Sequence, residues 1–254
     1  MSLLVLDKAN IRFGGLVAVN DVSFSIEKGD LFGLIGPNGA GKTTCFNLIT
    51  GVYQPTSGSI EFDGKSIIGL KPSKIAARGI ARTFQNIRLF SALSVLENVI
   101  VGCNVRHMST LGSAIALLPG AVKETSKFKE KALGLLDTFG LTKVANVRSC
   151  DLAYGTQRRL EIARALATDP KLLLLDEPAA GMNPQESEDL MALIRRLRDE
   201  FGQTILLIEH DMKVVMGICE KIVVLDHGAE IAQGPPEQIR KNPRVIEAYL
   251  GEPV

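Results

Sequence analysis

The sequence predicts an α/β fold with a mainly parallel core sheet, an antiparallel β subdomain and an inserted α-helical subdomain. Two runs that are apolar apart from Thr204, namely 172–175 and 204–208, are each followed by acidic residues, which is typical of parallel strands buried on both faces. The segments 3–11 and 22–26 instead alternate apolar and polar residues, as the strands of an antiparallel pair do. Residues from about 98 to 147 are helical in period and separate the two halves of the sheet.

Length, charge and cysteine content limit the class of protein. A chain of 254 residues accommodates one large α/β domain or two small ones, and a net charge of +1 gives no electrostatic reason to expect a nucleic-acid partner. The four cysteines are scattered without a C-x-x-C pair, which argues against a disulfide framework or a zinc site and suits a reducing compartment. The N-terminus places Asp7, Lys8 and Arg12 among its apolar residues and so lacks the apolar region of a signal peptide. The longest uncharged apolar stretch, 108–122, is too short to span a bilayer, and we expect a cytoplasmic protein.

A glycine-rich loop stands between the apolar run 31–35 and a helical pattern at 45–50. This loop, called the P-loop below, consists of Gly36, Pro37, Asn38, Gly39, Ala40, Gly41, Lys42, Thr43 and Thr44. Strand, glycine loop and helix is the context in which G-x-x-x-x-G-K-[ST] binds phosphates, because backbone N–H groups and the helix start point at the anion. A chance match is expected in roughly one chain in a hundred of this size. We expect Lys42 to reach the β- and γ-phosphates of a nucleotide and the Thr43 hydroxyl to hold Mg²⁺.

Two carboxylates follow the predicted strand 172–175, at the sheet edge where phosphates and a metal would lie. Asp176 is predicted to bind Mg²⁺, as the strand-end aspartate of P-loop proteins does. Glu177 is then available to orient or deprotonate a water that attacks the γ-phosphate. The alternative, an acidic turn after a core strand, is much less favoured once the P-loop is present.

Two further polar residues end predicted strands. Gln85 follows the strand expected over 80–84, where a side chain faces the ligand crevice, and a hydrogen-bonded turn residue is the alternative. His210 follows the strand expected over 204–208, which favours a phosphate contact, although a lone histidine is more often structural. Phe13, beside Gly14 and Gly15, is either a packing residue or a platform that stacks on an adenine ring.

The rest of the chain predicts connecting elements and one unassigned surface. Turn residues fill 53–59, and the remaining expected elements are a strand over 59–62 that ends in the turn Asp63-Gly64, a strand over 221–226, and a helix pair over 236–250 broken at Pro243. The most irregular part of the helical region is expected around 112–125. The segment 87–96 is unusually apolar for a loop and is either core or a surface that meets a partner.

The order of these features over nearly the whole chain resembles the ATP-binding subunits of ABC transporters. The features are Phe13, the P-loop, Gln85, the segment Leu152-Ala153-Tyr154-Gly155-Thr156, the strand that ends in Asp176-Glu177, and His210. The resemblance implies one P-loop NTPase (RecA-like) domain over 1–254. Its nucleotide-binding core and β subdomain would occupy about 1–86 and 168–254, and its helical subdomain, ending in the signature helix, about 87–167.

The resemblance also implies cofactors and roles. The cofactors are ATP and Mg²⁺, and two such subunits face each other head to tail. Phe13 matches the adenine-stacking aromatic, Glu177 the catalytic glutamate, His210 the switch histidine and Gln85 the glutamine that senses Mg²⁺ and faces the membrane subunits. Residues 152–156, called the signature segment below, would cap the partner's ATP. Lys42, Glu177 and His210 would be catalytic, and Thr43, Gln85 and Asp176 would hold the metal.

Two positions depart from the family's pattern. The signature is usually LSGGQ, and Ala153 removes a hydroxyl donor to the partner's γ-phosphate, a loss of about 1–3 kcal/mol by analogy with other buried hydrogen bonds. The loop after the glutamate usually ends in aspartate and here ends in Asn183. We therefore expect ATP hydrolysis at the chain's own site and a weaker cap for the opposite one.

Several separate stretches also resemble the subunits of branched-chain amino acid importers. They are RTFQNIRLFSALSVLENV, DEPAAGMNP, IEHDMKVVMGICEKIVVLDHG and NPRVIEAYLG. The implied partners are a second ATP-binding subunit, identical or different, two transmembrane permease subunits and, indirectly, a periplasmic or extracellular substrate-binding protein. The implied location is the inner face of the cell membrane, and the segment after Gln85 would form the groove for a coupling helix of the permease. Import of urea or amides, lipopolysaccharide export, and a soluble ABC ATPase acting on ribosomes or DNA are the alternatives.

Overall fold

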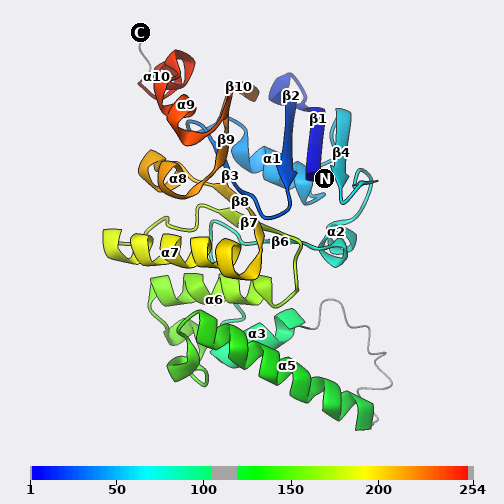
Figure 1. Ribbon diagram of the computed structural model, residues 1–254. Helices are drawn as coiled ribbons and strands as arrows, with labels where there is room; N and C mark the ends of the chain where they lie inside the picture. Colours follow the sequence, from blue (N-terminus) through cyan, green and yellow to red (C-terminus); the bar gives the residue numbers. More distant parts are fainter. Residues whose placement is uncertain (1, 104–118, 251–254) are drawn as a thin grey trace.

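The computed structural model describes residues 2–103 and 119–250 (Figure 1). In this part of the chain the strands form one ten-stranded sheet in the order β5-β4-β1-β2-β10-β9-β3-β8-β7-β6. The strands are β1 (Ser2–Phe13), β2 (Leu16–Glu27), β3 (Leu31–Ile35), β4 (Ser57–Phe62), β5 (Lys65–Ser66), β6 (Ile80–Arg82), β7 (Leu172–Asp176), β8 (Thr204–Ile208), β9 (Lys221–Asp226) and β10 (Ala229–Gly234).

Five neighbouring strands, β9, β3, β8, β7 and β6, run parallel to one another. Every residue of β3, β7 and β8 is buried, because helices cover both faces of this half of the sheet. Alternate leucines of β7 enter two different hydrophobic clusters: Leu172 and Leu174 face one side, Leu173 and Leu175 the other. The predicted parallel strands 172–175, 204–208 and 221–226 are thus confirmed.

The other half of the sheet is antiparallel. β1 pairs with β2 and with β4, and β4 pairs with β5. A parallel contact of Ala229 in β10 with Asn20 in β2 joins the two halves. The predicted antiparallel pair is confirmed, and both strands are longer than the alternation of 3–11 and 22–26 indicated.

Helices occupy both sides of the sheet (Figure 1). They are α1 (Lys42–Ile49), α2 (Pro72–Arg78), α3 (Val95–Cys103), α5 (Pro119–Thr138), α6 (Tyr154–Leu166), α7 (Pro184–Phe201), α8 (Met212–Ile218), α9 (Pro236–Lys241) and α10 (Pro243–Leu250), with 3₁₀ turns at Thr142–Val144 and Ser149–Asp151. Residues of α1 pack with the antiparallel strands in one cluster, whereas α3, α5, α6 and α7 contribute to the other. The predicted terminal helix pair, interrupted before Pro243, is confirmed.

Three predicted boundaries are wrong for local reasons. β4 begins at Ser57 instead of 59. Gly58 (φ 88°) approaches β1 so closely that a Cβ there would lie 2.0 Å from the carbonyl oxygen of Lys8, and because it has no Cβ the strand can include it. β6 ends at Arg82 instead of 84, since the carbonyl oxygen of Phe84 accepts a hydrogen bond from the buried side chain of Arg158. In the region expected to be irregular, 119–125 belongs to α5, because a proline is readily accommodated as the first helical residue. Residues 112–118 of that prediction lie outside the described residues.

Strand β10 had no counterpart in the sequence analysis. Its sequence, Ala229 to Gly234, is only partly buried and shows no apolar alternation. It forms by antiparallel pairing with β9. Among the helices of residues 2–103 and 119–250, none has the length and apolar character required to cross a membrane.

Helix α7 begins with a reciprocal cap that predicts a measurable stability effect. The Glu186 N–H donates to Asn183 Oδ1 (2.9 Å), and the Asn183 N–H donates to Glu186 Oε2 (3.1 Å). We expect Asn183→Ala to lower the free energy of unfolding by about 1 kcal/mol, measured by urea denaturation, because the first turn loses its acceptor. Asn183→Asp keeps an acceptor and is the matched control. Equal stability of all three proteins would contradict this role of the cap.

Candidate functional site

The P-loop joins β3 to α1 at the carboxyl edge of the parallel strands. Gly36 (φ 151°) passes so close to β9 that a Cβ would lie 2.1 Å from the carbonyl oxygen of Leu225. Gly41 (φ 99°) caps α1 in the left-handed region, with the carbonyl oxygen of Ala18 2.6 Å from the place of a Cβ. Glycine is therefore required at both ends of the loop.

The predicted lysine is buried inside this loop. Lys42 Nζ donates to the carbonyl oxygens of Gly36 (2.6 Å) and Pro37 (2.9 Å). Burial lowers the pKa of Lys42, and the charges of Glu177 and Asp176 oppose this shift. Thr43 is exposed at the start of α1, and Thr44 is half-buried. The ammonium group thus lies between the loop carbonyls and within the field of the two strand-end carboxylates.

Asp176, at the end of β7, forms a buried ion pair that the sequence analysis missed. Arg82 Nη2 donates to Asp176 Oδ2 at 2.8 Å, and the two side chains are 8% and 5% exposed. Arg82 also donates from Nη1 to Asn47 Oδ1 of α1 (2.7 Å). The position of Arg82 at the end of a strand parallel to β7 was the available signal. This pair neutralises the buried carboxylate and ties β6, β7 and α1 together.

Two other predicted residues, Gln85 and His210, lie beside Glu177. Gln85 Nε2 donates to Glu177 Oε2 at 3.0 Å, and His210 Nδ1 lies 3.8 Å from Glu177 Oε1. Glu177 itself has φ 44°, a left-handed conformation that non-glycine residues seldom adopt. Its N–H donates to the carbonyl oxygen of Ile208 (2.9 Å), which holds this conformation at the end of β8. Strained backbone of this kind is common at functional sites.

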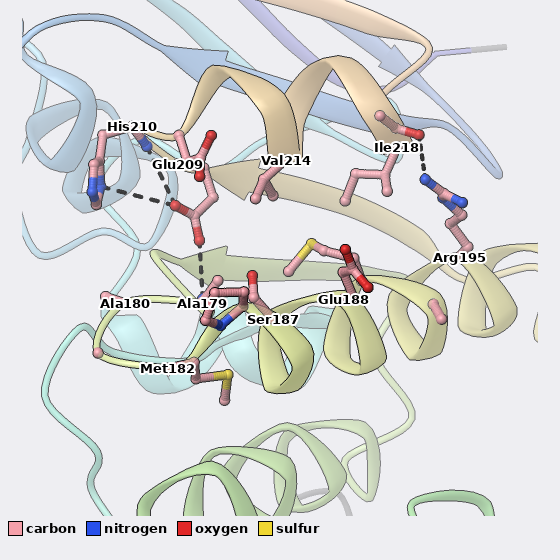
Figure 2. A pocket seen from close by; sticks show the side chains of 16 residues that line it. Ala179, Ala180, Met182, Ser187, Glu188, Arg195, Glu209, His210, Val214 and Ile218 are labelled. Atoms are coloured by element: carbon pink, nitrogen blue, oxygen red, sulfur yellow. Dashed lines mark hydrogen bonds and ion pairs between the residues drawn. The ribbon is translucent and has the colours of Figure 1, made fainter.

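Glu209, which was not selected from the sequence, contacts the loop after Glu177 and the backbone of His210 (Figure 2). Its side chain is 1% exposed and accepts hydrogen bonds from the N–H groups of Ala179 (3.0 Å) and His210 (3.3 Å). Burial raises the pKa of Glu209. Figure 2 shows it between the loop at Ala179 and the start of α8, beside a cavity of about 780 Å³ lined by residues of α7 and α8. Glu209 thus fixes the loop after Glu177 and the backbone of His210 together.

Phe13, at the end of β1, makes an exposed aromatic pair. Its ring lies 5.1 Å from that of Tyr53, at an interplanar angle of 70°. Phe13 is 44% and Tyr53 37% exposed, so the pair is not core. Tyr53 lies shortly after α1, with its N–H bonded to the carbonyl oxygen of Asn47, and was not selected from the sequence because it stood among turn residues.

The signature segment lies at the beginning of α6. Ala153 is the N-cap residue and provides no side-chain hydrogen bond. Tyr154 packs on Gly181, where an added Cβ would lie 3.4 Å from the tyrosine ring, and a Cβ added at Gly155 would lie 3.0 Å from a carboxylate oxygen of Glu186. The segment Leu152 to Thr156 therefore packs on the loop that follows Glu177 and on the start of α7. Asn183, which stands where the family's loop usually ends in aspartate, caps α7 of its own chain.

The residues of the site fit a magnesium nucleotide. Thr43, Gln85 and Asp176 offer hydroxyl, amide and carboxylate oxygens, the hard donors that Mg²⁺ prefers. No group of three or more His, Cys, Asp or Glu residues able to hold a metal occurs in the described residues. Mg²⁺ is commonly held by one or two carboxylates, water and phosphate oxygens, a set to which Asp176 and Thr43 could contribute.

Comparisons with known proteins agree with this geometry. The family described as "ABC transporter" matches residues 19–180, and "Branched-chain amino acid ATP-binding cassette transporter" matches residues 230–254. The chain is 51% identical to the high-affinity branched-chain amino acid transport ATP-binding protein BraF of Pseudomonas aeruginosa, with 98% of both chains covered. It is 48% identical to the corresponding protein LivG of Escherichia coli, again over 98% of both.

Solved structures give the same result. An ATP-binding cassette of an ABC transporter in its ADP conformation superposes with a TM-score of 0.86 at 32% identity, covering 99% of this chain and 100% of that one. A dimeric cassette in a post-hydrolysis state with ADP and Pi gives a TM-score of 0.76 at 26% identity, over 92% and 98%. The chain therefore belongs to the ABC transporter family of ATP-binding cassette proteins.

Proposed function

We propose that this chain is the ATP-hydrolysing subunit of a membrane importer for branched-chain amino acids. The observation that carries hydrolysis is the arrangement of Glu177, with Gln85 bonded to one carboxylate oxygen and His210 3.8 Å from the other. A cassette that only bound nucleotide would not require this carboxylate at the strand end. The 51% identity to BraF supports the importer and its substrate class.

ATP would enter with its phosphates on the P-loop. Residues 36–44 supply the backbone N–H groups, and the Lys42 ammonium exchanges the carbonyl oxygens of Gly36 and Pro37 for β- and γ-phosphate oxygens. Burial lowers the pKa of Lys42, and the negative charge of bound phosphates would raise it again. The adenine ring would stack on Phe13, with Tyr53 supporting that ring edge-on.

The metal would be held by Thr43, Gln85 and Asp176. Mg²⁺, when bound, neutralises charge on the β- and γ-phosphates. For Asp176 to serve as a ligand, its pairing with Arg82 must be shared between the guanidinium and the metal shell. Arg82 is itself anchored by Asn47, so it need not leave the site.

Glu177 would orient and deprotonate the attacking water, and His210 would contact the γ-phosphate. Gln85 places Glu177 in this structure by donating to its Oε2. When the amide turns toward the metal, the carboxylate becomes available to water. The Glu209 contacts hold the His210 backbone and the Ala179 loop during that change.

The partners follow from two surfaces. The signature segment would cap the ATP of a second ATP-binding subunit, with Ala153 providing a weaker cap than a serine would. A largely apolar groove of about 630 Å³ would receive a coupling helix from one of the two permease subunits; among its lining residues are Ile75, Phe84, Leu89, Phe90 and Val101. In this arrangement residues 87–167 act as a helical subdomain, and 1–86 with 168–254 as the nucleotide-binding core. The chain would then lie at the inner face of the membrane and serve a substrate-binding protein indirectly.

Replacing Glu177 tests the hydrolytic role. We expect Glu177→Gln to lower the ATP hydrolysis rate about 10²–10⁴-fold, because the base is lost while shape and polarity are kept. Phosphate release measures the rate, and equilibrium binding of labelled ATP should remain at wild-type affinity. Glu188→Gln, at an exposed position of α7, is the matched control and should hydrolyse ATP normally. Unchanged turnover in Glu177→Gln would refute the assignment.

Phe13→Ala tests adenine stacking. Loss of one aromatic–base stack costs about 1–3 kcal/mol of binding free energy, so the KM for ATP should rise about 5- to 150-fold at nearly constant kcat. Phe13→Tyr keeps the ring and should retain the wild-type KM. If Phe13→Ala binds ATP normally, the aromatic pair has another purpose.

The importer assignment is tested in the membrane. The chain is purified from detergent-solubilised native membranes, its companions are identified by mass, and uptake of labelled leucine is measured in cells that lack it. We expect two polytopic membrane proteins and a loss of leucine uptake. Companions that are ribosomal or DNA-bound would contradict import, and a loss of urea uptake in place of leucine uptake would contradict the substrate class.

A further inference from the structure

Arg158, in the second turn of α6, is completely buried. Its guanidinium donates from Nη1 to the carbonyl oxygen of Phe84 (2.7 Å) and from Nη2 to the carbonyl oxygen of Gln85 (2.8 Å). It also donates to Glu161 Oε2 (2.9 Å) and, more weakly, to the hydroxyl oxygen of Tyr154 (3.4 Å). A planar fork with several N–H donors can satisfy two neighbouring carbonyls at once, which an ammonium group cannot do with the same geometry.

The same helix face holds the far end of the segment 84–88. Glu161 Oε1 accepts the N–H of Arg88 (3.1 Å), and Arg164 Nη2 donates to the carbonyl oxygen of Arg88. Residues 158, 161 and 164 follow one another at three-residue intervals and so lie on one side of α6. The segment that carries Gln85 is thus fastened to α6 at both ends.

Arg158 connects two parts of the proposed mechanism, the segment that carries Gln85 and the signature segment. At one end, the Gln85 side chain donates to Glu177. At the other end, Tyr154 of the signature segment contacts both Arg158 and Gly181. A shift of the first turn of α6 would therefore move the backbone of Gln85, and with it the amide that holds Glu177.

A purely structural role explains this arrangement poorly. Burying an ion pair seldom stabilises a fold more than apolar residues of similar size do. Here the guanidinium takes over where strand pairing stops: the N–H of Thr83 still donates to the carbonyl oxygen of Leu174 in β7, and the carbonyl oxygens of Phe84 and Gln85 are bound by Arg158. The arrangement sets the position of one segment relative to one helix.

We propose that Arg158 is a positioning residue that fixes the backbone of Gln85 to the signature helix, so that docking of the signature segment on the partner's ATP moves Gln85 relative to Glu177. The inference rests on the proposed function and names a link between the two ATP sites.

The test compares the full-length chain with the double variant Arg158→Met/Glu161→Gln, which leaves no buried charge unpaired. We expect kcat for ATP hydrolysis to fall about 10- to 100-fold, as for a misplaced catalytic group, with the KM for ATP changed less than about twofold. The matched control is Arg198→Met/Glu220→Gln, which removes an arginine–glutamate pair between α7 and the start of β9. It should keep both constants.

A second measurement does not depend on hydrolysis. Hydrogen exchange of the amides in 84–88 is followed with and without ATP in the Glu177→Gln background. ATP should slow exchange in that background and in the Arg198/Glu220 control, but not in the Arg158/Glu161 variant. Arg158→Lys keeps the charge without the double donation and should behave as the Arg158/Glu161 variant does.

The outcomes separate the two proposals. A wild-type chain without ATPase activity would contradict the proposed function, and the exchange measurement would still test Arg158. Normal kcat in the folded Arg158/Glu161 variant, full rescue by lysine, or ATP-dependent protection of 84–88 without Arg158 would each overturn the positioning role. A parallel change of kcat, KM and melting temperature would assign Arg158 to stability alone and overturn it too.

Discussion

Complete burial of the central parallel strands constrains the rest of the structure. Because β3, β7 and β8 have no exposed residue, polar chemistry can enter this part of the sheet only where the strands end. The carboxyl ends of these strands lead directly into the P-loop, Glu177 and Glu209-His210. The site is therefore a consequence of packing: a sheet covered on both faces concentrates its functional groups at one edge.

The charges at that edge are balanced within the chain. Lys42 is held by two carbonyl oxygens, Asp176 by Arg82, and Glu177 by Gln85. Each of these contacts occupies an atom that phosphate, metal or water would use in the proposed mechanism. An unpaired charged side chain is costly when it is buried, so each of these side chains must keep its partner within the chain until phosphate, metal or water replaces it. Nucleotide binding is then an exchange of partners, with little net creation of buried charge.

The sequence specified the strands and the P-loop because their signals are local. Apolar runs, glycine spacing and strand-end carboxylates need no knowledge of the remaining chain, and 204–208 and 221–226 were predicted to the residue. What escaped prediction depends on distant neighbours. The role of Arg82 depends on its ion pair with Asp176, and that of Glu209 on its hydrogen bond with Ala179. Strand β10 forms only by pairing with β9. Asn183 was predicted to matter through its departure from a family pattern, whereas its side chain caps α7 of its own chain.

The loop after Glu177 shows why a single residue there can serve two tasks. Asn183 closes the first turn of α7 through Glu186, and the same Glu186 carboxylate lies against Gly155 of the signature segment. Glu209 holds the loop from the other side at Ala179. A loop fixed at both ends can pass a displacement of the signature segment toward Glu177 without unfolding. The cap therefore contributes to stability and, because it fixes Glu186, also sets the surface on which the signature segment rests.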